Sequence, residues 1–99
     1  MFVHIVLFWL KKEGVEEARQ AMVADCDSML AKIATVRHIW AGRAAMTDRE
    51  VADNTYDVGL CVVFDDSAAH DLYQDDPIHK EFIAKHGATW QRLRVYDFK

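Results

Sequence analysis

A tyrosine and a histidine flank the only proline of this chain, and they are the side chains best suited to chemistry. They lie in LYQDDPIHKEF, residues 72–82, where Tyr73 precedes His79 by six residues and Pro77 stands between them. A neutral imidazole can accept a proton near pH 7, and a phenol can donate a hydrogen bond to an oxygen on which negative charge develops. The pair is typical of acid/base catalysis beside a carbonyl group. The proline permits a kink that would turn both side chains toward one space.

His4 is the third candidate for this space. It interrupts the apolar stretch FVHIVLFWL, residues 2–10, which reads as a strand with His4 on one face. We therefore predict His79, Tyr73 and His4 as catalytic residues. The alternative for both histidines is a hydrogen-bonded place in the core, because His79 also falls on a helical stripe with apolar residues such as Phe82.

The other histidines give weaker signals. His38 falls in a second predicted strand, while His70 lies three residues before Tyr73, near enough on a helix to contact it. His79 and His86 are seven residues apart, about 10 Å along a helix, which is too far to share one metal ion. The sequence has no HxxxH motif and no paired carboxylates at ligand spacing. We predict no metal and no cofactor; a metal site would have to be assembled from distant segments.

Charge and cysteine content narrow the class of protein. The formal net charge is -4, with acids and bases interleaved along the chain, so we expect no nucleic-acid partner. Cys26 and Cys61 are far apart and form no CxxC motif, which favours buried, reduced thiols in a cytoplasmic protein. The apolar residues 1–10 lack a basic leader and a small-residue cleavage site, and they are too short to span a bilayer. We expect a first strand there and no membrane partner.

Hydrophobic periodicity predicts the elements that must position the candidate residues. They are a strand at 2–10, a helix at 15–33, strands at 36–43 and 55–64, a helix at 67–74, a second late helix from Pro77 and a last strand at 93–98. Asp76 and Pro77 are suited to begin the second late helix, and Gly87 to end it. Four further residues are predicted to belong to the core: Met22, Met29, Trp90 and Tyr96.

This order of elements is that of an α+β ferredoxin-like sandwich with an antiparallel four-stranded sheet, forming one domain over residues 1–99. Helices would cover only one face of that sheet. The other face is also apolar and would expose Val3, Ile5, Leu7, Trp9, Cys61 and Val63. An exposed apolar patch usually marks an association site, so we expect a homodimer through this sheet face. The alternative is that the C-terminal residues or the long loop after the second strand fold over it.

The whole chain resembles the stress-responsive A/B barrel, or Dabb, family. The resemblance rests on VHIVLFWL with its early histidine, on YDVGLCVVF, on LYQDDPIHKEF, and on the final VYDF, which contains Asp97. It implies a dimeric α/β barrel, in which the sheets of two ferredoxin-like subunits pack together.

The resemblance also implies a range of functions. Some family members resemble stress-associated oligomers without known chemistry, and one branch is similar to plant polyketide cyclases that carry out an aldol condensation. In that branch a tyrosine and a histidine matching Tyr73 and His79 act in the cavity, together with a histidine matching His4. We expect a dimer of unassigned activity with a pocket for a small hydrophobic ligand. The alternatives are an acid/base enzyme of the cyclase, lyase or isomerase type and a non-enzymatic stress-associated assembly.

Three positions depart from the cyclase pattern. Val58 stands where the cyclase has a strand histidine, Cys26 where it has a helix tyrosine, and Asp76 where the family often has a histidine before the proline. The resemblance therefore implies a general acid/base pocket and does not extend to the particular polyketide substrate.

Overall fold

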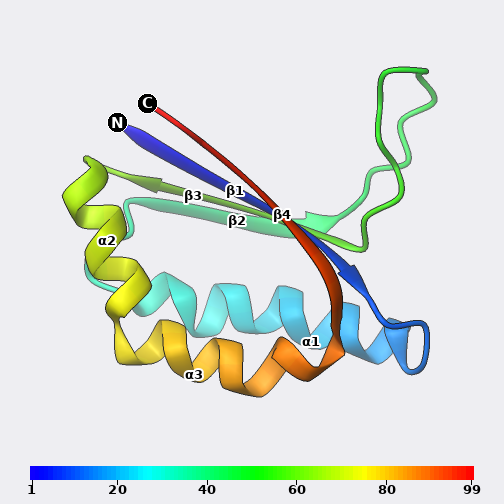
Figure 1. The fold of residues 1–99 in the computed structure, drawn as a ribbon, viewed down its shortest axis with the longest axis horizontal. Coiled ribbons are helices and arrows are strands. Elements are labelled where there is room, and N and C mark those ends of the chain that lie inside the picture. The colour runs from blue at the N-terminus through cyan, green and yellow to red at the C-terminus, as the bar shows by residue number, and fades with distance from the viewer.

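Four antiparallel strands form one sheet, and the helices lie on a single side of it (Figure 1). The computed structural model describes residues 1–99. The strands are β1 (Phe2–Leu10), β2 (His38–Arg43), β3 (Val58–Phe64) and β4 (Trp90–Phe98), in the spatial order β2-β3-β1-β4. The helices are α1 (Val15–Ser28), α2 (Ser67–Asp75) and α3 (Pro77–His86), with short 3-10 helices η1 (Leu30–Lys32) and η2 (Gly87–Thr89). This is the predicted ferredoxin-like α+β sandwich.

Strand β1 is the centre of the fold because it pairs with β3 on one side and β4 on the other. Its residues alternate strictly between buried and half-buried, and the buried set, which includes His4 and Phe8, faces the helices. The β-branched and aromatic composition of β1 suits such a central strand. Met22 and Cys26 of α1 are fully buried and belong to the same core as this face of the sheet.

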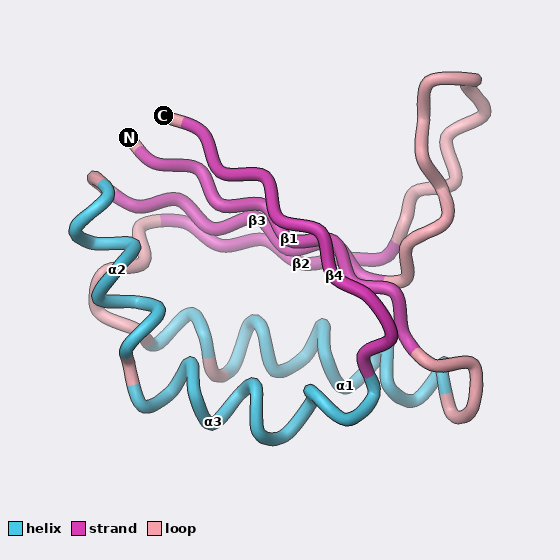
Figure 2. Tube along the Cα trace, in the orientation of Figure 1, coloured by secondary structure: helices cyan, strands magenta, loops and turns pink.

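Two aspartates cap the starts of α2 and α3, and the second lies at the break between these helices. Asp66 caps α2 by accepting a hydrogen bond from the backbone N–H of Ala69 at 2.8 Å, and Asp76 caps α3 by accepting one from Ile78 N–H at 2.8 Å. Pro77 occupies the first turn of α3, where its missing N–H costs nothing. The predicted start of this helix is confirmed. The chain changes direction here, as the tube trace shows (Figure 2).

Several boundaries differ from the prediction. Helix α1 ends at Ser28 and not near residue 33, because the chain tightens into η1 and still buries Leu30. Strand β3 begins at Val58 and not at residue 55, because the side chain of Asp57 is bonded to Arg19 and to the backbone N–H of Leu10. Strand β2 likewise begins two residues later than predicted, at His38. Strand β4 is longer than predicted, since pairing with β1 extends it back to Trp90. Helix α3 ends at His86, directly before Gly87, as predicted. Gly87 has a φ of -55°, so the chain enters η2 without a left-handed residue.

The sheet face opposite the helices is uncovered and largely apolar, with Arg92 and Arg94 of β4 at its end beside Trp9 and Leu7. The C-terminal residues form β4 and do not fold over it, so Trp40, Tyr96 and Phe98 are 59%, 53% and 56% exposed. The prediction that Tyr96 lies in the core is wrong, because Tyr96 pairs opposite Ile5 and points away from the helices with it. The loop between β2 and β3 projects beyond the sheet, away from the helices (Figure 1). Thr55 of this loop accepts a hydrogen bond from Trp9 Nε1 on the uncovered face.

None of the helices in the structure has both the length and the apolar character needed to cross a bilayer.

Candidate functional site

A cavity of about 170 Å³ lies between the sheet and the pair α2 and α3. Most of its lining is apolar, and the polar side chains in its wall are His4, Tyr73, His79 and Gln74. The structure therefore brings together all three residues predicted from the sequence to act. A mostly apolar cavity with a few convergent polar groups is the usual form of a small-molecule site.

Tyr73 and His79 meet across the helix break. Their ring centroids are 4.7 Å apart, with the ring planes inclined by 57°. Tyr73 is 1% exposed and also packs edge-on against Phe64, with centroids 4.9 Å apart. His79 is half-buried, and its Nδ1 atom is buried without a hydrogen-bond partner. The backbone of Gln74 lies near enough to the His79 ring to oppose the effect of burial on its pKa, but it makes no well-formed hydrogen bond to Nδ1.

His4 is held by the last strand. Because His4 and Asp97 are register partners in the β1–β4 ladder, their side chains lie on the same face, and His4 Nδ1 is 2.5 Å from Asp97 Oδ1. The His4 ring lies edge-on to Tyr73, with centroids 6.0 Å apart. The carboxylate therefore fixes the orientation of the imidazole that faces the tyrosine.

Burial controls the protonation of these groups. Burial lowers the pKa of His79 from its ordinary value of 6.5, and the neighbouring His4 ring adds to that effect. Burial also lowers the pKa of His4, against the opposing effect of the Asp97 carboxylate. Burial raises the pKa of Tyr73. At pH 7 both imidazoles are accordingly neutral and the phenol keeps its proton, because burial disfavours the charged form of each group.

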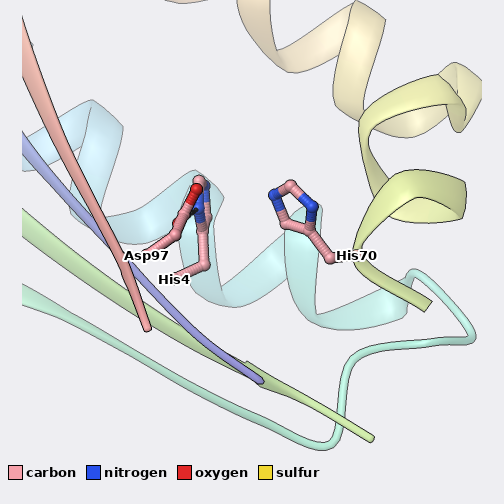
Figure 3. Close-up of side chains that lie close together, drawn as sticks. All are labelled: His4, His70 and Asp97. Carbon is pink, nitrogen blue, oxygen red and sulfur yellow. Dashed lines mark hydrogen bonds and ion pairs between the residues drawn. The ribbon is translucent and has the colours of Figure 1, made fainter. Parts of the chain in front are cut away.

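His70 also belongs to this cluster, although its position in the sequence gave only a weak indication of a functional role. Its ring stacks on Phe2, with centroids 4.5 Å apart, and lies 4.9 Å from the His4 ring. One potential ligand atom from each of His4, His70 and Asp97 lies within 4.8 Å of the other two (Figure 3). The three come from β1, α2 and β4, so their proximity follows from strand pairing and helix docking, not from spacing within one segment. The only signal in the sequence was the three-residue step from His70 to Tyr73.

The fold and the cavity define a ferredoxin-like α+β protein with a mostly apolar pocket between its sheet and its helices. The model of the Stress responsive A/B Barrel Domain, or Dabb, matches residues 2–99, and the chain belongs to this family. No curated protein sequence matches the chain significantly.

Solved structures of similar fold agree with this assignment. A Dabb family protein with a ferredoxin-like fold from Mesorhizobium loti is 23% identical, with a TM-score of 0.79, and the match covers 99% of this chain and 94% of that one. A dimeric protein of unknown function from Bacteroides fragilis is 24% identical, with a TM-score of 0.81 and the same coverage of 99% and 94%. A hydroxynitrile lyase from Passiflora edulis is 14% identical, with a TM-score of 0.82 and coverage of 98% and 90%. These neighbours establish the fold. Besides the Bacteroides fragilis protein, two further neighbours, from Jannaschia sp. and Thermobifida fusca, are described as dimeric.

Proposed function

We propose that the cavity binds a small carbonyl compound and that His79 and Tyr73 catalyse proton transfer at the carbon next to the carbonyl group. The observation that carries this proposal is the buried, unpartnered Nδ1 of His79 beside the Tyr73 ring in the wall of a mostly apolar cavity. His79 is the base that removes the proton. Tyr73 donates its phenolic hydrogen to the oxygen on which charge develops, and such donors stabilise the enolate most in a site with little water.

His4 and Asp97 support this arrangement from the sheet side. Asp97 accepts from His4 Nδ1–H, which holds the ring in one orientation next to Tyr73. His4 is thus placed to orient the tyrosine or to contact the far end of a ligand. The pair belongs to strands β1 and β4 of the sheet, whereas the base His79 belongs to α3.

The size of the cavity limits the ligand. A volume of about 170 Å³ is similar to that of cavities of roughly 150 Å³ that accept a benzene molecule. Leu93 and Val95 of β4 line one side and are 40% and 47% exposed, so the cavity opens there along the edge of the sheet. The fitting ligand is an apolar ketone or aldehyde with about six to ten heavy atoms, judged from that comparison.

Hydrogen–deuterium exchange tests the proposal without knowledge of the natural substrate. The chain is incubated in D₂O with a panel of small ketones, such as acetophenone and cyclohexanone, and NMR follows loss of the protons next to the carbonyl group. Wild type should accelerate the exchange of at least one ketone, and His79→Gln should reduce that acceleration at least about a hundredfold, the lower range for general base catalysis. His38→Gln is the matched control, because His38 is exposed in β2, and it should exchange as wild type does.

Two results would reject acid/base catalysis. One is a ketone that binds in the cavity, seen by chemical-shift changes at Tyr73 and His79, but is not exchanged. The other is equal exchange by wild type and His79→Gln, both folded by circular dichroism. The first result would favour a dimeric protein that binds a ligand passively.

We further propose that the chain forms its homodimer through the uncovered face of the sheet. The face is apolar at its centre, where Ile5 lies between Cys61 of β3 and Tyr96 of β4. Exposed aromatic residues flank this centre on both edge strands. Covering such a surface with a second copy removes it from water at both subunits at once.

A further inference from the structure

We propose that His4, His70 and Asp97 form a binding site for a divalent transition-metal ion of the zinc type. Neither the family nor the acid/base proposal assigns such a site. Two imidazoles and one carboxylate are a common donor set for these ions, and three protein ligands leave one coordination position open for water or a substrate oxygen.

The distances suit this donor set after small side-chain rotations. The three potential ligand atoms lie within 4.8 Å of one another, and His4 Nδ1 is 2.5 Å from Asp97 Oδ1. Ligands of a tetrahedral zinc ion are about 3.3 Å apart, given metal bonds of about 2.0 Å. The His4 and Asp97 atoms would move apart by less than an ångström, by about 0.8 Å on that geometry, while His70 would move closer. Figure 3 shows one ring nitrogen of His70 facing the other two side chains.

Hydrogen bonds set the tautomer of His70 that a metal ion requires. Its Nε2 atom lies 3.2 Å from the Gln74 side-chain nitrogen, which can only donate, so Nε2 is the unprotonated ring nitrogen and accepts this hydrogen bond. A metal ion at Nε2 would replace the Gln74 N–H. The proton is then on Nδ1, which faces the Asp71 carboxylate at 3.4 Å. A carboxylate that accepts the second ring N–H is the usual outer partner of a metal-bound histidine.

The charges around the cluster favour a cation. Asp97 forms an ion pair with His4 and with no lysine or arginine side chain, so its negative charge is not neutralised by a permanent positive charge. The His4 and His70 side chains are 6% and 14% exposed, whereas that of Asp97 is 35% exposed. Burial of the two imidazoles fixes their positions, and the exposed carboxylate on the edge strand gives an ion a route from solvent.

Ion binding requires only a proton shift within the cluster. In the chain without metal, the proton between His4 Nδ1 and Asp97 Oδ1 belongs to the neutral imidazole. When the ion bonds to Nδ1, that proton moves to Nε2 of the same ring, and the Asp97 oxygen exchanges its hydrogen bond for a metal bond. The ring stays neutral, and no proton has to leave the site.

Direct titration with metal tests the site. The full chain, without a histidine tag, is titrated with Zn²⁺ in competition with a coloured chelator, and with Co²⁺, whose visible spectrum reports four-coordination. We expect one ion per chain for wild type. His70→Gln keeps a polar side chain on the same helix and should weaken Zn²⁺ binding at least tenfold. Loss of a residue that only hydrogen-bonds to a metal ligand already lowers metal affinity about 10- to 100-fold, and tenfold is the lower limit of that range. Asp97→Asn should weaken Zn²⁺ binding similarly.

The controls separate this site from adventitious binding and from the acid/base proposal. His38→Gln removes a histidine outside the cluster and should bind as wild type does, and so should His79→Gln. Absence of Zn²⁺ binding by folded wild type would overturn the proposal, as would equal affinity of wild type and His70→Gln. Ketone exchange can be repeated with a chelator present, and metal binding is measured without ketone, so either proposal can fail while the other stands.

Discussion

The rings of Tyr73 and His79 lie 4.7 Å apart although the helix that carries the tyrosine ends between them. An unbroken helix would have placed residues six apart on different faces. The helix can be interrupted here because the Asp76 side chain accepts a hydrogen bond from the Ile78 N–H at the start of α3. Pro77, at the first position of α3, has no N–H that would need a partner. The only proline in the chain thereby helps to bring two residues of the cavity wall together, although it does not line the cavity itself.

Substitution of Tyr73 should separate its packing role from its chemical role. Tyr73→Phe keeps the ring contacts to Phe64, His4 and His79, so the free energy of unfolding should change by less than about 1 kcal/mol. Tyr73→Ala should cost about 4 kcal/mol, because it leaves a cavity in the core. Urea denaturation measures both values. Ketone exchange should fall in Tyr73→Phe despite its intact fold, and an unchanged exchange rate would remove the phenol from the mechanism.

A charge at the centre of the uncovered sheet face should prevent dimer formation. Ile5→Lys places an ammonium group between Cys61 and Tyr96, where a partner would have to bury it. Light scattering coupled to gel filtration should show a dimer for wild type and a monomer for Ile5→Lys. The matched control is Leu72→Lys, at a position that is 63% exposed on α2, and it should remain dimeric. A monomeric wild type at micromolar concentration would contradict the proposed interface.

The two cysteines should differ in reactivity and report the same interface. Burial raises the pKa of Cys26 to about 12, and its thiol should react with a maleimide only when the chain unfolds. Cys61 is half-buried on the uncovered face. It should react slowly in the wild-type dimer and quickly in Ile5→Lys, as mass spectrometry of the labelled peptides can determine. Equal labelling of Cys61 in both proteins would place it outside the contact between subunits.

Stability should fall at acidic pH through Asp25. The Lys85 ammonium, together with the buried His86 ring, holds the pKa of this carboxyl below its ordinary value of 3.8, and both nitrogens lie 2.7 Å from Oδ2. A carboxyl with a lowered folded pKa stabilises the fold at pH values above its unfolded pKa, and this stabilisation disappears as the pH falls through the folded value.

Denaturation at a series of pH values between 7 and 2 checks this effect. Asp25→Asn should be less stable than wild type at pH 7. The difference should shrink below about pH 4, where the carboxyl of the unfolded chain becomes protonated, and disappear below the lower folded pKa. Asp27→Asn, an exposed change on the same helix, should follow the wild-type profile. A constant difference across the range would show that the carboxylate charge does not contribute.

The order of elements could be predicted from the sequence because each element carries its own local signal. The alternation in β1, the helical spacing after Val15 and the Asp76–Pro77 cap all act within a few residues. The ends of β3 and β4 could not be predicted, since they depend on contacts with distant partners such as Arg19 and Leu10. Tyr96 was misplaced for a related reason: which face of the last strand is covered depends on its register with β1.

The same distinction applies to the candidate site. Tyr73, His79 and His4 could be selected by residue type and by their apolar surroundings. The role of His70 could not, because only the docking of α2 onto the sheet brings its ring to 4.9 Å from that of His4. Asp97 entered only through the family resemblance, and its contact with His4 depends on pairing between residues 93 positions apart.

That separation along the chain governs when the site can form during synthesis. The ribosome makes His4 93 residues before Asp97, and β4 cannot pair with β1 until it has left the exit tunnel. A nascent chain therefore carries the helices and three strands before its imidazole has an acidic neighbour. The cluster therefore forms only after β4 has paired with β1, so any ligand or ion that binds there selects molecules in which this pairing is complete.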